Sequence, residues 1–497
     1  MSHESFAATL ALIGLVILVS SLLSGAAERT GLPLVAIFLA LGAALGPAGL
    51  GLVELSLESE SLQVIATLGL LLVLFIDAIG VDIGELKEQR RLALYLLGPG
   101  TLIPAVLIAV AAWGLLDLPL PAAAILGAAL ASTDPVLLRI LIRNPALPSR
   151  ARLALRLESG MNDVILLPIV VLSMLLLREG GLGAAEAGER VVGLFLLGPL
   201  LGVVVGYVGI TLLDQVRRRV GVRRDYESLY ALGVAFTAYA AAEAVGGSGF
   251  LAGFAAGLVI AALDVELCDC FLDYGEASAE MFLLLTFVAF GASLIWSGLT
   301  VADGLTVLFA VVALGLRTVV LLPVLARAGI ATRDRRLIAW FGPRGLSSLL
   351  LVLLPVFAGI AGAERLFAIT CLVVLISVVL HGGGIAWYLR RQAAASAAAI
   401  ASAPPGAPAS PPSAEPPAAS PVPAAPGDVA ERITLDEVRA LQREERPFAL
   451  LDVRTERSWR DDTLKAAGAR RFPPDEAVRL ARERRLDPDD TLVLYCT

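Results

Sequence analysis

The chain has 497 residues, of which 57% are hydrophobic and only 17% are charged, and its mean hydropathy is +0.80. Soluble proteins contain about a quarter charged residues, so this composition excludes an ordinary soluble enzyme. The apolar residues recur in runs of about twenty, which is the pattern of a polytopic helical membrane protein. The net charge of -7 says little, because the informative charges are the few within apolar runs.

Histidine and cysteine are rare. Its only histidines are His3 and His381, and its only cysteines are Cys268, Cys270, Cys371 and Cys496. Their spacing fits no zinc, haem or iron–sulfur site, so we expect no bound cofactor.

Thirteen apolar segments are candidates for transmembrane helices. They cover residues 6–24, 32–53, 62–79, 92–115, 121–142, 151–177, 191–213, 226–245, 249–263, 277–296, 301–325, 337–360 and 366–389. No basic residue precedes the first segment, so we expect a retained helix rather than a signal peptide. The sequence therefore predicts an all-α polytopic membrane fold.

Basic residues are unevenly divided among the connections. Those after odd-numbered segments contain Arg29, Lys87, Arg90, Arg91 and the arginines within 139–156, 217–224 and 327–336, whereas the others hold little beyond Arg178, Arg190 and Arg365. Basic loops stay cytoplasmic. We therefore expect an N-terminus outside, a C-terminus in the cytoplasm and residence in the cell (inner) membrane.

The composition changes after the last segment. We assign residues 1–391 to a transmembrane domain, 392–427 to a linker rich in Pro, Ala and Ser, and 428–497 to a small cytoplasmic domain. Ten prolines between positions 404 and 426 favour an extended spacer. Beyond it, helical patterns at 435–446 and 475–485 alternate with strand patterns at 448–453 and 491–495, which predicts an α/β fold with a parallel sheet.

Segment five contains Ser132, Thr133, Asp134 and Pro135 at its middle. Proline removes a backbone donor and disfavours helical geometry in the residue before it. We therefore expect a broken helix with the Asp134 carboxylate at the break. Asp134 can cap the second half-helix, bind an ion, or do both.

Segment six carries Glu158, Ser159, Asn162 and Asp163 near membrane depth. Ser159 and Asp163 are four residues apart and share a helix face. An ionisable residue in the membrane is costly and is usually functional. Carboxylate, hydroxyl and amide oxygens are typical of a site for a hard cation.

Segment twelve contains Gly342, Pro343, Arg344 and Gly345, which predict a second broken helix. Paired interruptions in two halves of a chain indicate a transporter site at the bilayer midplane, here within inverted repeats around segment seven. Arg344 needs an acidic partner, and Glu158 is the obvious one. For Arg317 a structural and a functional role are equally supported. Asp77 is either a site ligand or a solvated helix end.

These motifs resemble those of the monovalent cation:proton antiporter family, the sodium/proton exchangers, over roughly residues 6–390. The resemblance implies about 13 helices, crossed broken helices five and twelve, a homodimer and elevator-like alternating access. It implies that Asp163 is the central ion-binding carboxylate, with Asp134, Ser159 and Thr133 close by. Asn162 would support this site, and Glu158 would pair with Arg344. Asp77 matches an acidic ligand of some relatives only approximately.

A carboxylate removed from water holds a proton more tightly, and a bound cation displaces that proton. Asp163 can therefore carry either ion, which couples the two gradients. Because an asparagine, Asn162, precedes Asp163 where a second aspartate would add charge, we predict electroneutral one-for-one exchange for pH homeostasis. Na⁺ is the favoured cation, with Li⁺ or K⁺ as alternatives. The other expected partners are the proton, the lipid bilayer and a second copy of the chain; we expect no nucleic acid.

The tail resembles a partial rhodanese domain through Leu451-Asp452-Val453-Arg454 and Tyr495-Cys496. The usual histidine segment is replaced by residues 464–469, and the loop that would cradle the Cys496 sulfur is missing. Such a cysteine lacks the surroundings that activate a thiol, so we expect an inactive, truncated tail. Cys496 would be catalytic only if the domain were completed; sequencing past the codon after Thr497 tests this.

Two other functions are compatible with the sequence. One is a membrane-anchored sulfurtransferase whose helices are only a tether, although a tether needs no buried charges such as Asp163 or Arg344. The other is a cation channel or transporter under redox control through Cys496. Competition between sodium and protons in proteoliposomes separates exchange from conduction.

Overall fold

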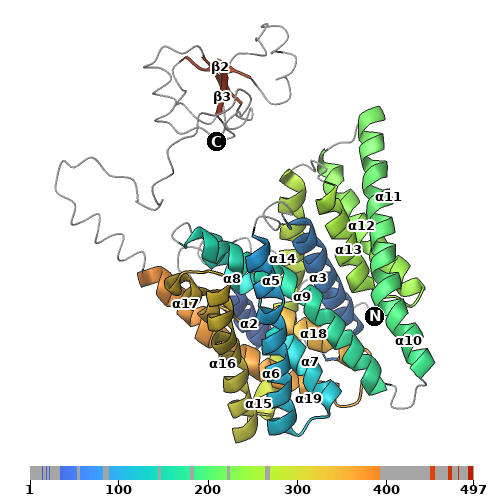
Figure 1. The fold of residues 1–497 in the computed structure, drawn as a ribbon, viewed down its shortest axis with the longest axis vertical. Coiled ribbons are helices and arrows are strands. Elements are labelled where there is room, and N and C mark those ends of the chain that lie inside the picture. Colours follow the sequence, from blue (N-terminus) through green and yellow to red (C-terminus); the bar gives the residue numbers. More distant parts are fainter. Residues whose placement is uncertain are drawn as a thin grey trace, which may run out of the picture. The chain divides into compact units, whose positions relative to one another are not determined.

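The computed structural model describes residues 34–52, 56–81, 89–143, 147–178, 184–220, 224–263, 269–391, 448–453, 468–472 and 491–495, with single positions 14, 18, 22 and 480. The chain divides into two units, Met1–Ala403 and Pro404–Thr497. The first unit is helical throughout its described part (Figure 1). The predicted segment 6–24 and the predicted tail helices lie almost wholly outside the described residues.

The first half of the membrane unit contains α2 (Leu34–Leu45), α3 (Glu60–Ile79), α5 (Arg90–Leu97), α6 (Pro99–Leu116), α7 (Leu120–Ala131), α8 (Pro135–Arg143), α9 (Ser149–Arg178), α10 (Ala184–Val192), the π-helical η1 (Gly193–Leu197) and α11 (Gly198–Arg219). The second half contains α12 (Arg224–Ala244), α13 (Gly249–Ala262), α14 (Asp269–Ala292), the 3₁₀ turn η2 (Leu294–Trp296), α15 (Ser297–Thr300), α16 (Gly304–Arg327), α17 (Thr332–Trp340), α18 (Leu346–Phe357), α19 (Ala363–Ser377) and the π-helical η3 (Val378–Gly382). The helix continues beyond η3 to Arg391.

Seven of the described helical stretches are long and apolar enough to cross a membrane, or up to eight if a pair bent by 56° at Ser293 counts as one. Four shorter apolar helices, within α2, α12, α13 and α18, accompany them. A multi-pass membrane fold is thus supported, whereas the thirteen spans stay a prediction. Some helices are short because backbone breaks divide the apolar runs.

Both predicted breaks are present. Residues 132–134 separate α7 from α8, and residues 341–345 separate α17 from α18. Each break contains or adjoins a proline, Pro135 or Pro343, that cannot donate a backbone hydrogen bond. By contrast, α16 passes through the predicted segment eleven as one continuous helix with Arg317 inside it.

The helices pack as two sets. In the first set, α11 packs on α13, α13 on α3, and α14 on α2 and α3; in the second, α6 packs on α7 and α16, and α7 packs on α9 and α18. Figure 1 shows α11–α13 on one side and α16–α17 on the other. The sets meet where α3 contacts α9 and α18, where α2 contacts α8, and where the η2–α15 connector contacts α19. Both broken helices belong to the second set.

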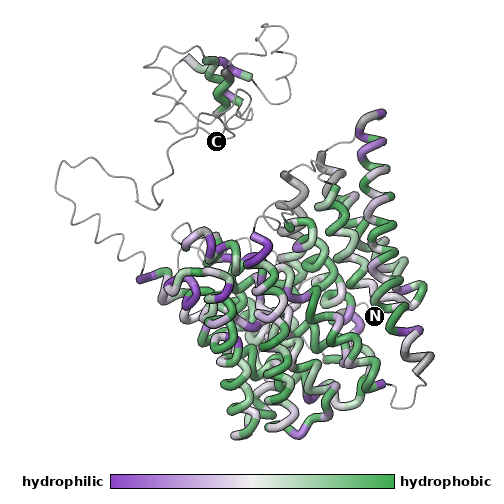
Figure 2. Tube along the Cα trace, in the orientation of Figure 1, coloured by the Kyte–Doolittle hydropathy of each residue, from purple (hydrophilic) through white to green (hydrophobic). Residues whose placement is uncertain are grey.

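Hydrophilic residues gather at one end of the second set, around α5, α8 and α17 (Figure 2). A separate apolar cluster lies under this end and joins Leu92, Leu138, Ala151 and Ile338 with Ile385 of the last helical stretch. Amphipathic helices therefore close the bundle here, whereas the remaining surface is largely apolar. This is the distribution expected of a membrane protein with one basic face.

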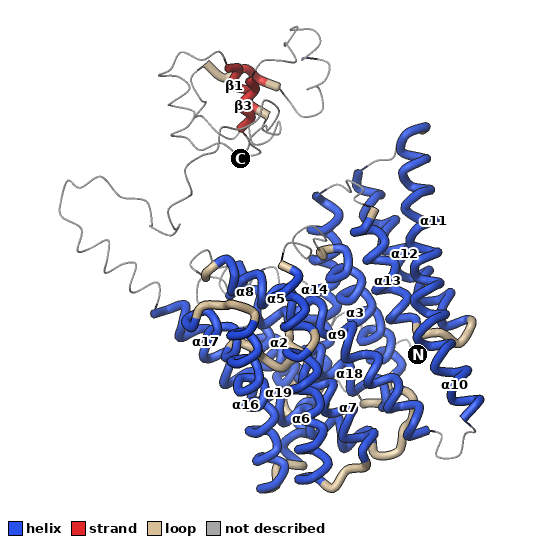
Figure 3. Tube along the Cα trace, viewed as in Figure 1, coloured by secondary structure: helices blue, strands red, loops and turns tan. Residues whose placement is uncertain are grey.

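The tail contains a three-stranded sheet (Figure 3). Strand β1 (Phe448–Asp452) lies between β2 (Arg470–Arg471) and β3 (Thr491–Tyr495), and it is parallel to both. The two predicted strands and their parallel arrangement are therefore confirmed. Cys496 lies outside the described residues.

The contact between α11 and α13 depends on glycine. A Cβ atom at Gly202 would overlap the backbone of Ala252, and one at Gly206 would lie 2.9 Å from the Ala256 Cα atom. Small residues permit this approach, which is a common means of helix association in membranes.

We predict that Gly202→Ala lowers the thermal unfolding temperature of the purified protein, because overpacking costs about 1–3 kcal/mol. Gly114→Ala is the matched control, since a Cβ at Gly114 meets nothing within 4 Å. Thermal unfolding in detergent measures both variants. Equal shifts in the two would contradict the close-packing argument.

Candidate functional site

The two breaks contact each other through their backbones. The Asp134 N–H donates a hydrogen bond of 2.9 Å to the Pro343 carbonyl. The first broken helix therefore crosses the second at the point where both lose helical geometry. Four half-helix ends, each with unpaired backbone groups, meet at this crossing.

The Asp134 carboxylate caps both half-helices that begin at the crossing. Its Oδ1 atom accepts hydrogen bonds from the N–H groups of Val136 (2.7 Å) and Leu137 (3.2 Å) at the start of α8. Its Oδ2 atom accepts one from the Leu346 N–H (2.5 Å) at the start of α18. A negative charge stabilises a helix N-terminus, so this one carboxylate stabilises two. Of the roles left open for Asp134, the structure shows capping, and ion binding by Asp134 stays a prediction.

Two buried arginines contact the C-terminal ends of the other two half-helices, α7 and α17. The Arg344 Nη1 atom donates to the carbonyls of Ala131 (3.1 Å) and Ser132 (2.8 Å) at the end of α7. The Arg317 Nη1 atom donates to the Ala339 carbonyl (2.7 Å) near the end of α17. Each helix C-terminus thus receives the positive charge that its dipole favours.

Glu158 forms its ion pair with Arg317. The Arg317 Nε and Nη2 atoms each donate to a different Glu158 oxygen at 2.7 Å, in a bidentate pair that is almost fully buried. The predicted pairing of Glu158 with Arg344 is therefore wrong for this structure. The reason is that the α7 carbonyls take Arg344, while Arg317 reaches Glu158 from α16.

Thr133 links the two charged groups. Its hydroxyl donates to Glu158 Oε1 (3.1 Å) and accepts from Arg344 Nη1 (3.0 Å). The Thr133 side chain thus belongs to the network that holds the break.

Asp163 lies beside the first break. Its side chain is buried, and its Oδ1 atom accepts a 2.5 Å hydrogen bond from the Ser132 hydroxyl. Ser347, from the start of α18, also interacts with this carboxylate. Unlike Asp134 and Glu158, Asp163 receives hydroxyl groups rather than backbone N–H groups or a guanidinium among the described residues. Hydroxyl and carboxylate oxygens suit a hard monovalent cation or a proton.

Several buried polar atoms near Asp163 have no partner among the described residues. They are both amide atoms of Asn162, the Ser348 hydroxyl, and the Nε and Nη2 atoms of Arg344. An unsatisfied buried polar group costs about 1–3 kcal/mol, so such groups mark places where water or an ion is bound. Ser159 is buried too, and its hydroxyl faces the Arg156 carbonyl at 3.5 Å.

A cavity of about 420 Å³ separates α3 from α8 and α9. Asp77 and Ser159 line it together with Arg139 and Arg156. Gly160 lies beside Asp77, since a Cβ atom at this glycine would be in ordinary contact with the Asp77 side chain at 3.8 Å. The structure thus brings Asp77 to the wall of a cavity that reaches Ser159.

The sequence analysis did not select Ser347, Ser377 or His381 as site residues. The Ser377 hydroxyl accepts a 2.7 Å hydrogen bond from the Arg344 N–H and lies 3.0 Å from His381 Nδ1. Ser347 follows the second break much as Ser132 begins the first, and this parallel was an available signal. The sequence around Ser377 gives no sign that its hydroxyl accepts a hydrogen bond from Arg344 in segment twelve. Among the described residues, no three His, Cys, Asp or Glu side chains form a metal cluster.

Comparisons with known proteins show which family the chain resembles. Residues 15–391 match the family model "Sodium/hydrogen exchanger, transmembrane". The chain is 26% identical over 371 residues to the K(+)/H(+) antiporter NhaP2 of Shewanella sp. (strain MR-4), covering 74% of this chain and 64% of that protein. It is 27% identical over 342 residues to the Na(+)/H(+) antiporter NhaG of Bacillus atrophaeus, covering 66% and 63%. The chain thus spans under two thirds of the length of these two relatives.

A solved structure has the same fold. The sodium proton antiporter MjNhaP1 from Methanocaldococcus jannaschii at pH 8 superposes with a TM-score of 0.62 at 21% identity, over 77% of this chain and 100% of that one. The family match extends over most of the chain and includes both breaks, Glu158 and Asp163. The chain therefore belongs to the sodium/hydrogen exchanger family of transmembrane proteins.

Proposed function

We propose that this protein is a secondary antiporter that exchanges a monovalent cation for a proton at the Asp163 carboxylate. The observation that carries the proposal is the position of Asp163, which is buried beside the first break and held by the Ser132 hydroxyl. The antiporter names of the relatives NhaP2 and NhaG support it.

The charges at the crossing set the stoichiometry that we propose. Three buried carboxylates, Asp134, Glu158 and Asp163, lie near two buried guanidiniums, Arg317 and Arg344. With all five groups ionised the cluster has one excess negative charge. One proton or one monovalent cation neutralises it, and a second would again leave a net charge in a medium of low dielectric.

Asp163 is the group that takes up the neutralising ion. The oxygens of Asp134 are engaged with three backbone N–H groups and those of Glu158 with Arg317, so these contacts already occupy both carboxylates. Among the described residues Asp163 receives only hydroxyl groups, so a proton or a cation can compete for its oxygens. The unsatisfied amide of Asn162 supports a bound ion or water nearby.

The cavity lined by Asp77 and Ser159 is the proposed access route to the site in this conformation. It lies between α3 of the first helix set and α8–α9 of the second. A displacement of the second set against the first would close this side and open the other, which is an alternating-access movement.

We further propose the orientation inferred from the basic loops, with the C-terminal tail in the cytoplasm, and a homodimer. Labelling of single cysteines from the outside tests the orientation. Chemical cross-linking in native membranes tests the dimer. The rhodanese resemblance of the tail stays a prediction from the sequence, and we propose no activity for the tail.

We predict that Asp163→Asn abolishes exchange, because an amide neither binds a proton at physiological pH nor supplies the charge that holds a cation. The measurement is the cation-driven decay of a pH gradient in proteoliposomes, with Na⁺, Li⁺ and K⁺ titrated separately. We expect the largest response with Na⁺.

Asp303→Asn is the matched control. Asp303 caps α16 through a 2.8 Å bond from the Thr306 N–H, and asparagine caps equally well. Sodium-driven proton flux that survives in Asp163→Asn would refute the assignment.

We predict that transport is electroneutral, because one cation replaces one proton in the charge cluster. Current recordings on a solid-supported membrane loaded with proteoliposomes should show no steady charge movement that scales with turnover. The proton flux measured in the same vesicles establishes that the protein is active. A current proportional to that flux would require a different stoichiometry.

We predict that Glu158 is energetically coupled to Arg317 more strongly than to Arg344. Breaking a buried pair costs about 3–5 kcal/mol, because it leaves one charge unpaired. Glu158→Gln and Arg317→Gln should each lower thermal stability, and the double variant should lose less than the sum of the two. Glu158→Gln combined with Arg344→Gln is the comparison. Stronger coupling in that second pair would show that Arg344 is the partner.

A further inference from the structure

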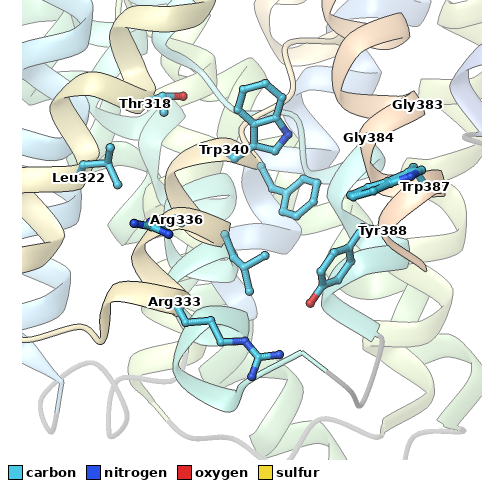
Figure 4. A pocket seen from close by; sticks show the side chains of 11 residues that line it. Thr318, Leu322, Arg333, Arg336, Trp340, Gly383, Gly384, Trp387 and Tyr388 are labelled. Carbon is cyan, nitrogen blue, oxygen red and sulfur yellow. The ribbon is translucent and has the colours of Figure 1, made fainter. Parts of the chain in front are cut away.

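A second cavity lies between α16, α17 and the last helical stretch, away from Asp163 (Figure 4). Its volume is about 960 Å³, at the upper end of the range for small-molecule sites. Apolar and aromatic side chains line most of it, namely Leu322, Leu337, Trp340, Phe341, Trp387 and Tyr388. The cavity therefore offers a large apolar surface near the end of two membrane helices.

Two cationic side chains line the same cavity. Arg333 and Arg336 are three residues apart on α17, so they share one face of this helix. Both are exposed, and neither has a hydrogen-bonding or ion-pair partner in the described part of the chain. The Arg391 guanidinium lies 5.2 Å from the centre of the Trp387 ring and adds positive charge nearby. Asp334 is the acidic residue that accompanies them on α17.

Two glycines keep the wall of this cavity open. Gly383 and Gly384 follow the π-helical turn η3 and line the cavity opposite α17. A Cβ at Gly383 would meet no atom within 4 Å, and one at Gly384 would lie 3.5 Å from Trp340 Nε1. Side chains at these positions would project into the space that the aromatic residues enclose.

We propose that this cavity binds one anionic phospholipid of the bilayer, with its phosphate between Arg333 and Arg336 and an acyl chain against Trp340 and Leu322. The choice follows from complementarity of charge and polarity. A free phosphate would leave the apolar wall uncovered, and a zwitterionic lipid would leave the arginines uncompensated. Tryptophan and arginine at a membrane interface are typical of lipid contacts. The proposal goes beyond ion exchange and does not rest on it.

The cavity is also connected to the crossing. Thr318 lines it and donates a 3.0 Å hydrogen bond to the Ala339 carbonyl, which Arg317 also holds. The Trp340 ring lies 5.9 Å from the His381 ring, and His381 contacts Ser377, the acceptor of the Arg344 N–H. A lipid in the cavity therefore supports α17, the half-helix that ends at the second break.

The test measures lipid binding to the purified full-length protein in detergent by native mass spectrometry. The probes are dioleoylphosphatidylglycerol, which is anionic, and dioleoylphosphatidylcholine, which is zwitterionic. We expect the unaltered protein to retain phosphatidylglycerol selectively. Arg333→Gln with Arg336→Gln should weaken this binding at least tenfold, because two phosphate contacts are lost. Gly383→Leu should weaken it without any change of charge.

The matched control is Arg90→Gln with Arg219→Gln, which removes two exposed arginines outside the cavity. An equal loss in this control would overturn the proposal in favour of general surface charge. Equal retention of phosphatidylcholine would overturn the anionic selectivity. Inorganic phosphate that displaces phosphatidylglycerol at millimolar concentration would show an anion site rather than a lipid site.

Discussion

A helix that breaks inside a membrane exposes backbone groups to a medium that cannot hydrate them, and this constraint organises the whole site. The two breaks leave four half-helix ends at one crossing. Asp134 stabilises both N-termini, whereas Arg344 and Arg317 stabilise the C-termini. The buried charges are thus first a structural requirement of the broken helices. The proposed exchange uses what is left over: three buried carboxylates face two buried guanidiniums, and Asp163 is the carboxylate that neither caps a half-helix nor pairs with a guanidinium among the described residues.

Local chemistry made much of this predictable. Pro135 and Pro343 cannot continue a hydrogen-bonded helix, so both breaks follow from single residues. Asp134 directly precedes a half-helix, and its cap on α8 follows from position. Its second cap, on Leu346, depends on a helix more than two hundred residues away. No pattern within segment five contains that information.

The partner of Glu158 illustrates what sequence could not decide. The motifs paired Glu158 with Arg344 and assigned no partner to Arg317, although both arginines carry the same charge. The outcome depends on which carbonyls each guanidinium reaches once the helices cross, because a helix end competes with a carboxylate for the same donor. Arg344 comes from a break and bonds to the other break, which leaves Glu158 to Arg317 on an unbroken helix. A lone arginine inside the apolar run of α16 signalled that a partner existed, but not its identity.

Both helix sets are closely packed internally, and this has a mechanical consequence. The first set relies on backbone contact at glycines such as Gly42 and Gly202, which resists shear because neither surface can deform. The second set has such a contact at Gly127 against Ala105, and it is also bound by directional charge contacts that would be costly to interrupt in lipid. Neither block is suited to internal rearrangement. If the exchange proposed above involves a movement between the two sets, we expect it at the contacts of α3 with α9 and α18 rather than inside either set.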